Sequence, residues 1–376
     1  MDREVRVVEQ RLPHDSHSVP AELLAPLQEK ARRSGLWCVE SPAAYGGAGL
    51  SALGVCVVRE EASKCDMGAY VPACGAFGWD PPSAIFGGTD EQIKKYAVPA
   101  IEQGQRCFIA LSEPSGGSDP GRAIQTRATY ANGAWTLNGT KSWISHAGTA
   151  PWGVIFARTN DQPGGKGISA FIVDMSSPGI TTRPIPVIRS DAPYEIFLDD
   201  CKVPEQNLLG PEGGGFSIGK LYVERYRVQY AAGVVGVAQA ALDIALRYAV
   251  ERQVFGSALA DKQAIQWMLA DSEIELRAAR QLVYAAAIKA DSGEAFQTDA
   301  SVAKVFATEV AGTIVDRCIQ ILGGMGVARE MPLERWYREL RIKRIGEGPS
   351  EVHRMLIARS LIRSARSGAP PSGSAG

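Results

Sequence analysis

The chain has 376 residues, of which 45% are hydrophobic and 22% are charged, and its formal net charge is −1. This length and composition predict a globular protein with room for two or three domains. A net charge so close to zero excludes a strongly basic nucleic-acid binder, and we expect neither nucleic acid nor a membrane as a partner.

Seven cysteines are scattered without any C-x-x-C pair, and the four histidines show no metal-binding spacing. Such a set is typical neither of a disulfide framework nor of a zinc site, so we expect no metal. No apolar run looks long enough to cross a bilayer, and the charged residues 1–12 lack the apolar core of a signal peptide. These features predict a cytoplasmic protein.

Residues 1–106 are predicted to form an N-terminal helical domain. Helical spacing of apolar residues indicates helices over Ala21–Gly35 and Leu53–Ser63, separated by the turn-rich loop Ser41–Gly49. Another helix is expected to begin near Thr89, because Thr-Asp-Glu-Gln is typical of a capped helix start.

Residues 107–214 are predicted to form a middle β domain, because the apolar spacing changes to a period of two. Short strands joined by turns such as Asn132-Gly133 and Asn138-Gly139 indicate an antiparallel barrel or sandwich. The expected strands are 107–111, 124–130, 135–138, 141–145, 153–158, 168–174, 180–186 and 194–198. No helix-sized segment lies between them, which argues against a Rossmann sheet.

Residues 215–363 are predicted to form a C-terminal four-helix bundle, because three long apolar stripes recur there at helical spacing. The small, polar residues 364–376 are expected to be a disordered tail. The predicted fold class is therefore α+β and multidomain, in the order helical, β, helical.

The stretch Arg338–Arg359 contains a carboxylate in an unusual place. Gly346-Glu347-Gly348-Pro349 interrupts two helical patterns, so Glu347 is expected on a short kink between helices. It could simply be a first-turn acid that complements a helix dipole. Glycine on either side also allows a close approach to a ligand, which would make Glu347 a functional residue.

Four further motifs have both an ordinary and a functional interpretation. Each could be a turn, a core strand, a helix end or a helix cap, respectively, and each also has groups that suit a polar or aromatic ligand. The motifs are L-S-E-P-S-G-G-S-D (111–119), K-S-W-I-S (141–145), R-Q-V-F-G (252–256) with Gln263, and Q-I-L-G-G-M-G (320–326).

Together with the W-x-x-x-x-P-x-x-Y-G-G-x-G stretch (37–49) and the R-x-x-x-I-x-x-I-x-E-G segment (338–348), these motifs resemble the acyl-CoA dehydrogenase family. The resemblance covers nearly the whole chain and includes the order of the domains. It implies an FAD-dependent enzyme of fatty acid metabolism that converts an acyl-CoA thioester to a trans-2-enoyl-CoA and passes electrons to an electron-transfer flavoprotein.

By that resemblance, Glu347 is the base that removes the α-proton while the β-hydrogen leaves as hydride to flavin N5. Arg227 is expected near the catalytic carboxylate. Tyr226 stands where some members carry their base, which leaves Glu347 as the sole base. Burial under substrate is expected to raise the pKa of Glu347 more than the following helix N-terminus lowers it.

The resemblance also assigns cofactor contacts. Ser112 would lie near the flavin ring, Ser118 would contact FAD or the CoA end of the substrate, and Trp143 and Ser145 would lie against the flavin. The remaining contacts would come from a neighbouring subunit, which implies a homotetramer or a homodimer. These residues are Arg252, Phe255 and Gln263 at the R-x-x-F-G motif, and Gln320, Gly323 and Gly324 at the Q-x-x-G-G motif.

Departures from the family pattern leave alternatives open. Gly346 replaces a frequent Tyr, from which we infer a wider cavity and a bulkier or longer acyl group. Pro349 and Glu351 also differ from the residues frequent in the family, so the flavin contacts there can differ.

Alternative functions remain open. The alternatives are an acyl-CoA oxidase, an enoyl-thioester reductase, an acyl-carrier-protein dehydrogenase and a non-catalytic scaffold.

Overall fold

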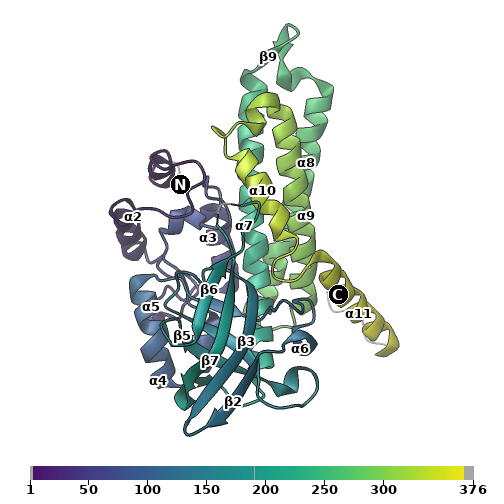
Figure 1. Ribbon diagram of the computed structural model, residues 1–376. Coiled ribbons are helices and arrows are strands. Elements are labelled where there is room, and N and C mark those ends of the chain that lie inside the picture. Colours follow the sequence, from purple (N-terminus) through teal and green to yellow (C-terminus); the bar gives the residue numbers. More distant parts are fainter. Residues whose placement is uncertain (1–2, 190, 368–376) are drawn as a thin grey trace. The chain divides into compact units, whose positions relative to one another are not determined.

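The computed structural model describes residues 3–189 and 191–367. It divides into two compact units (Figure 1). The bundle unit consists of Met1–Leu27, Ser51–Ala76 and Glu224–Gly376, and the sheet unit consists of Gln28–Leu50 and Phe77–Val223. The domain boundaries at 106, 214 and 363 stay predictions.

The sheet unit is built on an eight-stranded sheet. The strands are β1 Phe108–Ala110, β2 Arg127–Ala131, β3 Ala134–Ile144, β4 Trp152–Arg158, β5 Ile168–Asp174, β6 Ile180–Pro184, β7 Tyr194–Pro204 and β8 Leu208–Leu209. Their order is β6-β7-β3-β2-β4-β5-β8, with β1 beside β4. Most neighbours are antiparallel, but β4 pairs in parallel with β1 and β2, so the sheet is mixed rather than purely antiparallel.

Two of the predicted strands are in fact one. β3 continues through Asn138-Gly139, so the expected hairpin turn at that dipeptide is wrong. The pairing of β3 with β7 instead shifts register there, and Gly139 has a φ of 147°. A Cβ at Gly139 would lie 2.6 Å from the Thr126 hydroxyl, so the close approach of the backbone to Thr126 requires glycine. The turn at Asn132-Gly133 is confirmed, with both residues at positive φ.

The strands β4 and β5 carry apolar side chains on both faces. Ile155 and Phe171 belong to a core shared with β3 and β7. Their neighbours Phe156 and Ile172 belong to a second core beneath the helical segment 90–103. This segment comprises α4 Asp90–Gln92, a π-helical turn and α5 Val98–Gln103, and it begins with a Thr89 capping box as predicted. α6 Pro120–Ala123 is a further short helix of the unit.

The bundle unit is helical, as predicted. Its helices are α1 Val5–Glu9, α3 Ala52–Ala62, α8 Gln263–Asp291, α9 Gln297–Leu322, α10 Leu333–Lys343 and α11 Ser350–Ser367, with most of α7 Gly215–Glu251; α2 Ala21–Arg33 is divided between the units. A core of mostly alanine and valine packs α7, α8, α9 and α10 together. A hairpin of β9 Gln253–Val254 and β10 Ser257–Ala258 follows α7 (Figure 1).

Two helical segments, α7 and Gln297–Val327, are long and apolar enough to cross a membrane by length and composition, contrary to the sequence expectation. Residues of both helices line the bundle core, and the core helix of a globular protein passes the same test. The predicted tail at 364–376 begins inside α11, which runs to Ser367, and residues 368–376 lie outside the described part.

Candidate active site

Glu347 lies in a tight turn between α10 and α11, as the sequence predicts. Glu347 has a φ of 57° and Gly348 has a φ of 95°. The left-handed region costs a non-glycine residue about 1–2 kcal/mol, so the surrounding structure must stabilise this turn. Backbone strain of this kind is typical of functional sites.

Side chains from three helices hold the turn by its carbonyl oxygens. Arg227 of α7 donates from Nε to the main-chain oxygen of Glu347 at 3.2 Å, and His353 Nε2 of α11 lies 3.1 Å from the same oxygen. Lys304 of α9 donates from Nζ to the oxygen of Gly348 at 2.7 Å. Arg227 therefore lies beside Glu347 as expected, but this bond goes to the backbone rather than to the carboxylate.

The electrostatic surroundings of the Glu347 carboxyl act in opposite directions. Burial raises its pKa above the ordinary value, and the positive charges of Arg227, Lys343 and Lys304 oppose that rise. The net direction is upward, as the sequence argument expects. Burial also lowers the pKa of Lys304 to about 8. The opposing charges come from three side chains, two of which the sequence analysis did not identify.

The space beside Gly346 is occupied by Tyr230. A Cβ at Gly346 would lie 2.6 Å from the Tyr230 hydroxyl oxygen. Lys343 Nζ lies 4.0 Å from the centroid of the Tyr230 ring and 3.8 Å from that of Tyr70, so cation–π contacts hold the tyrosine in place. Tyr230 therefore fills the space that a larger residue 346 would need, and the wider cavity predicted from Gly346 stays a prediction.

In the sheet unit, a buried ion pair connects two of the sequence motifs. Lys141 Nζ lies 2.7 Å from Glu113 Oε1, and both side chains are almost completely buried. Glu113 also accepts from the amides of Gln125 at 2.6 Å and Thr126 at 3.1 Å. The pair fastens the L-S-E-P loop to the K-S-W-I strand. Sequence reasoning missed it, although a charged residue in each motif was a usable signal.

A main-chain hydrogen bond at the same place joins Ser112 to the residue before Trp143. The Ser142 amide donates to the Ser112 oxygen at 3.0 Å. Trp143 has a φ of 66° and is 59% exposed, so the alternative that it is a core residue is wrong. Its strained position lies where β3 shifts register against β7. Ser145 is half-buried and Ser118 is exposed.

The other predicted cofactor contacts gather at one end of the bundle unit. Arg252 and Phe255 belong to the β9–β10 hairpin at the end of α7, and Gln263 begins α8. Because α8 and α9 pack side by side and a short link joins them, the Gln320-to-Gly324 stretch at the end of α9 returns to this end (Figure 1). Phe255 is 99% exposed at the hairpin tip.

These residues are far from Glu347 within one chain. Arg227 and Arg252 lie on and just beyond the same continuous helix, α7. At a rise of 1.5 Å per residue, the 25 residues between them span about 37 Å. One protomer therefore does not bring Arg252 to the turn that carries Glu347.

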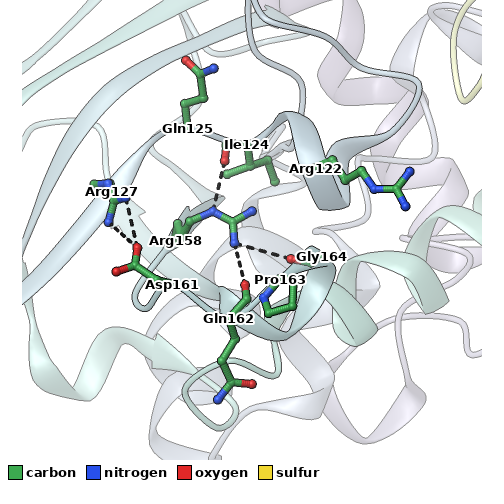
Figure 2. Close-up of a pocket in the computed structure, with 9 residues that line it drawn as sticks. All are labelled: Arg122, Ile124, Gln125, Arg127, Arg158, Asp161, Gln162, Pro163 and Gly164. Carbon is green, nitrogen blue, oxygen red and sulfur yellow. Dashed lines mark hydrogen bonds and ion pairs between the residues drawn. The ribbon is translucent and has the colours of Figure 1, made fainter.

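An open pocket of the sheet unit has a volume of about 440 Å³. Figure 2 shows the arginines of its wall, Arg122, Arg127 and Arg158. Each guanidinium already has partners. Arg158 donates to the main-chain oxygens of Ile124 and Gln162, Arg127 pairs with Asp161, and Arg122 pairs with Asp119. Aspartates therefore offset two of the three positive charges, and main-chain oxygens hold the third guanidinium in place.

Within the described residues, His14, Asp15 and Glu334 form a group that could hold a metal ion. Arg338 already forms an ion pair with both carboxylates, because its guanidinium lies 2.9 Å from an oxygen of Asp15 and 2.9 Å from one of Glu334. The group is therefore part of an ion-pair network between the N-terminal segment and α10.

The exposed groups suit a flavin dinucleotide. Arg252, Gln263 and Gln320 are exposed, and a guanidinium fork matches a diphosphate. A Cβ at Gly323 or Gly324 would meet nothing within 4 Å, so the backbone there is open to a ligand. The exposed Trp143 indole offers a flat surface for an aromatic ring system.

Comparison with known proteins assigns the chain to a family. It matches "Acyl-CoA dehydrogenase, N-terminal domain" over residues 1–104, "middle domain" over 108–201 and "C-terminal domain" over 213–362. The chain belongs to the acyl-CoA dehydrogenase family. The rat mitochondrial short-chain specific acyl-CoA dehydrogenase is 39% identical over 343 residues, which are 90% of this chain and 83% of the relative.

Solved structures agree with this assignment. Butyryl-CoA dehydrogenase from Megasphaera elsdenii aligns with a TM-score of 0.85 and 33% identity, covering 96% of this chain and 94% of that one. The FAD complex of PigA aligns with a TM-score of 0.84 and 26% identity, covering 96% and 93%. This acyl-CoA dehydrogenase is an FAD-dependent oxidoreductase that acts on a CH–CH bond.

Proposed function

We propose that this enzyme oxidises an acyl-CoA thioester to the trans-2-enoyl-CoA, with Glu347 as the base, and that an electron-transfer flavoprotein takes the electrons. The observation that carries the proposal is the Glu347 turn. Its carboxyl lies on a left-handed turn, its pKa is raised by burial, and three cations surround it. A raised pKa brings a carboxylate base nearer the working pH, where it accepts a proton more effectively.

The chain's own residues would handle the proton. In its ionised form Glu347 accepts the α-proton, and Arg227, Lys343 and Lys304 stabilise that ionised form before the proton arrives. FAD, when bound, accepts the β-hydrogen as a hydride. Tyr226 carries no carboxylate, so it supplies no second base on that side of α7.

For the cofactor we propose two groups of contacts. Ser112, Ser118, Trp143 and Ser145 of one protomer contact the flavin side or the substrate. A neighbouring protomer supplies Arg252, Phe255, Gln263, Gln320, Gly323 and Gly324. The distance along α7 and the full exposure of Phe255 support this division.

Shared contacts require an oligomer, for which we propose a homotetramer or a homodimer. Large apolar side chains on the bundle support it, since Trp267 is 62% exposed and Ile274 is 65% exposed on α8. A cytoplasmic location and a role in fatty acid metabolism stay proposals.

We further propose a short acyl group as the substrate. The name of the rat relative supports this preference, and so does the position of Tyr230 against Gly346. A base that reaches the α-carbon must have the following acyl carbons close to it. Tyr230 lies directly beside the turn and so restricts the room for them.

Anaerobic titration of the purified protein with acyl-CoAs of four to sixteen carbons tests the proposal, with the flavin absorbance as the readout. We expect the short thioesters to bleach the flavin. Glu347→Gln should keep its flavin and lose bleaching, whereas Glu330→Gln, an exposed acid before α10, should behave as wild type. Bleaching by Glu347→Gln at the wild-type rate would disprove the assignment of the base.

The same titration separates the alternatives. Rapid reoxidation of the reduced enzyme by oxygen would favour an oxidase. A flavin that every acyl-CoA leaves oxidised would favour an acyl-carrier-protein thioester or the reductase direction. A colourless protein would favour a scaffold.

A further inference from the structure

The turn that carries Glu347 relies on side chains for its hydrogen bonds. The main-chain oxygens of Glu347 and Gly348 accept hydrogen bonds from side chains. Among the described residues, no main-chain amide donates to either oxygen. The flanking oxygens differ. Arg344 accepts from the Ser350 amide at 3.1 Å, and Pro349 accepts from the Val352 amide at 3.0 Å. The central two carbonyls are therefore held from outside the turn.

Lys304 and His353 are two of the outside donors, and both are completely buried. Lys304 Nζ lies 2.7 Å from the Gly348 oxygen and 3.3 Å from the Arg344 oxygen, so one ammonium spans the turn. His353 Nε2 lies 3.1 Å from the Glu347 oxygen. A Cβ at Gly348 would lie 3.0 Å from His353 Nε2, which shows how closely the ring packs on the turn.

The protonation of His353 follows from its surroundings. Burial, and then the charges of Arg227 and Lys304, lower its pKa to about 4, so the ring is neutral at pH 7. A neutral imidazole has one N–H. Because Nε2 faces a carbonyl oxygen, the proton is on Nε2, and Nδ1 has no hydrogen-bond partner among the described residues. His353 is therefore an uncharged donor, unlike Lys304.

We propose that Lys304 and His353 are positioning residues for Glu347, which they fix in one orientation by holding the carbonyl oxygens of its turn. The inference rests on the proposed function of Glu347 as the base. A left-handed turn without these donors has buried carbonyls to satisfy and other conformations to adopt. A base displaced by about 1 Å can lose roughly 100-fold in rate, so a small relaxation of the turn is enough to be measured.

The two residues differ in their effect on charge. The charged and titratable groups around Glu347 are Arg227 and Glu224 from α7, Lys304 and Glu309 from α9, Lys343 from α10, and Glu351 and His353 from α11. Removing the Lys304 charge raises the pKa of Glu347, so the acidic limb of the kcat/KM profile moves to higher pH. Removing neutral His353 leaves that limb in place.

The experiment compares His353→Leu, His353→Gln, Lys304→Met and Lys304→Arg as FAD-loaded holoenzymes with a short-chain acyl-CoA. His353→Gln keeps an uncharged N–H donor, and Lys304→Arg keeps the charge. The readouts are kcat and KM, their pH profiles, and exchange of the substrate α-proton with D2O by the reduced enzyme. This exchange measures the base without net oxidation, and flavin content and melting temperature report the fold.

We expect His353→Leu to lower kcat and α-proton exchange roughly 10- to 100-fold with little change in KM and an unshifted acidic limb. His353→Gln should recover most of the rate. Lys304→Met should lower kcat and α-proton exchange and also shift the acidic limb of the kcat/KM profile to higher pH. Lys304→Arg should not shift that limb. If Lys304→Met does not fold, the two His353 variants decide.

A flavin-loaded His353→Leu with wild-type exchange would overturn the inference, and so would a His353→Gln as slow as His353→Leu. A wild type that neither oxidises any thioester nor exchanges an α-proton would instead disprove the proposed function. The two failures are therefore distinguishable.

Discussion

Breaking the buried pair between Lys141 and Glu113 should have unequal effects, depending on which partner is removed. Each side chain can escape an unpaired charge by changing protonation, and the cost depends on how far its pKa must move. Burial has already lowered the pKa of Lys141 to about 8, so at pH 7 the lysine becomes neutral at an extra cost of about 1.4 kcal/mol. Glu113→Gln should therefore destabilise by about 1–2 kcal/mol.

Lys141→Met leaves the opposite problem. The Lys141 charge holds the pKa of Glu113 below its ordinary value of 4.5. Without that charge, the buried carboxylate must stay charged or take up a proton at pH 7. Raising its pKa from 4.5 to 7 costs about 3.4 kcal/mol. We expect a loss of about 3–5 kcal/mol, as for other broken buried pairs. The amides of Gln125 and Thr126 keep the loss near the lower limit.

Urea unfolding at pH 7, followed by tryptophan fluorescence and flavin release, measures the three variants. The double variant Lys141→Met/Glu113→Gln should be more stable than Lys141→Met alone, because no buried charge remains. At pH 9 the cost of Glu113→Gln should shrink, since Lys141 is then neutral in the wild type as well. Strictly additive losses, or a larger loss from Glu113→Gln, would refute the reasoning.

Three further predictions concern the two units. Glu347→Gln should retain FAD but lower the single-turnover rate of flavin reduction by roughly 10²–10⁴-fold, the range of general base catalysis; a smaller loss would point to another base. Gly346→Ala should lower the melting temperature, because its Cβ meets the Tyr230 hydroxyl at 2.6 Å, at a cost of about 1–3 kcal/mol, and Tyr230→Phe should relieve part of that cost. Because the folded pKa of Glu113 is depressed, its contribution to stability is present above pH 4.5 and is lost as the pH falls through the folded value. Acid unfolding curves of wild type and Glu113→Gln should therefore converge at low pH, and curves that stay parallel would contradict the cause.

Local signals were sufficient for most of the secondary structure. The helices over 21–33 and 52–62 begin and end close to the predicted residues, and the helix at 90–92 begins where it was predicted to, because caps and apolar spacing act within a few positions along the chain. The strand 168–174 was predicted to the residue for the same reason. The predicted turn at Asn138-Gly139 was wrong, because pairing with β7 outweighs the local preference of this dipeptide for a turn.

The residues of the candidate site divide in the same way. Sequence by itself determined that Glu347 interrupts two helices, since Gly346, Gly348 and Pro349 are local breakers, and it singled out the motifs of the family. Only the tertiary structure decided which groups surround them. Lys304 and His353 meet at the Glu347 turn, Tyr230 fills the space beside Gly346, and Glu113 pairs with Lys141. Apart from His353, which follows Glu347 by six residues, these contacts join residues at least 28 positions apart. Apolar spacing specifies which face of a helix is buried but not which side chain it meets there.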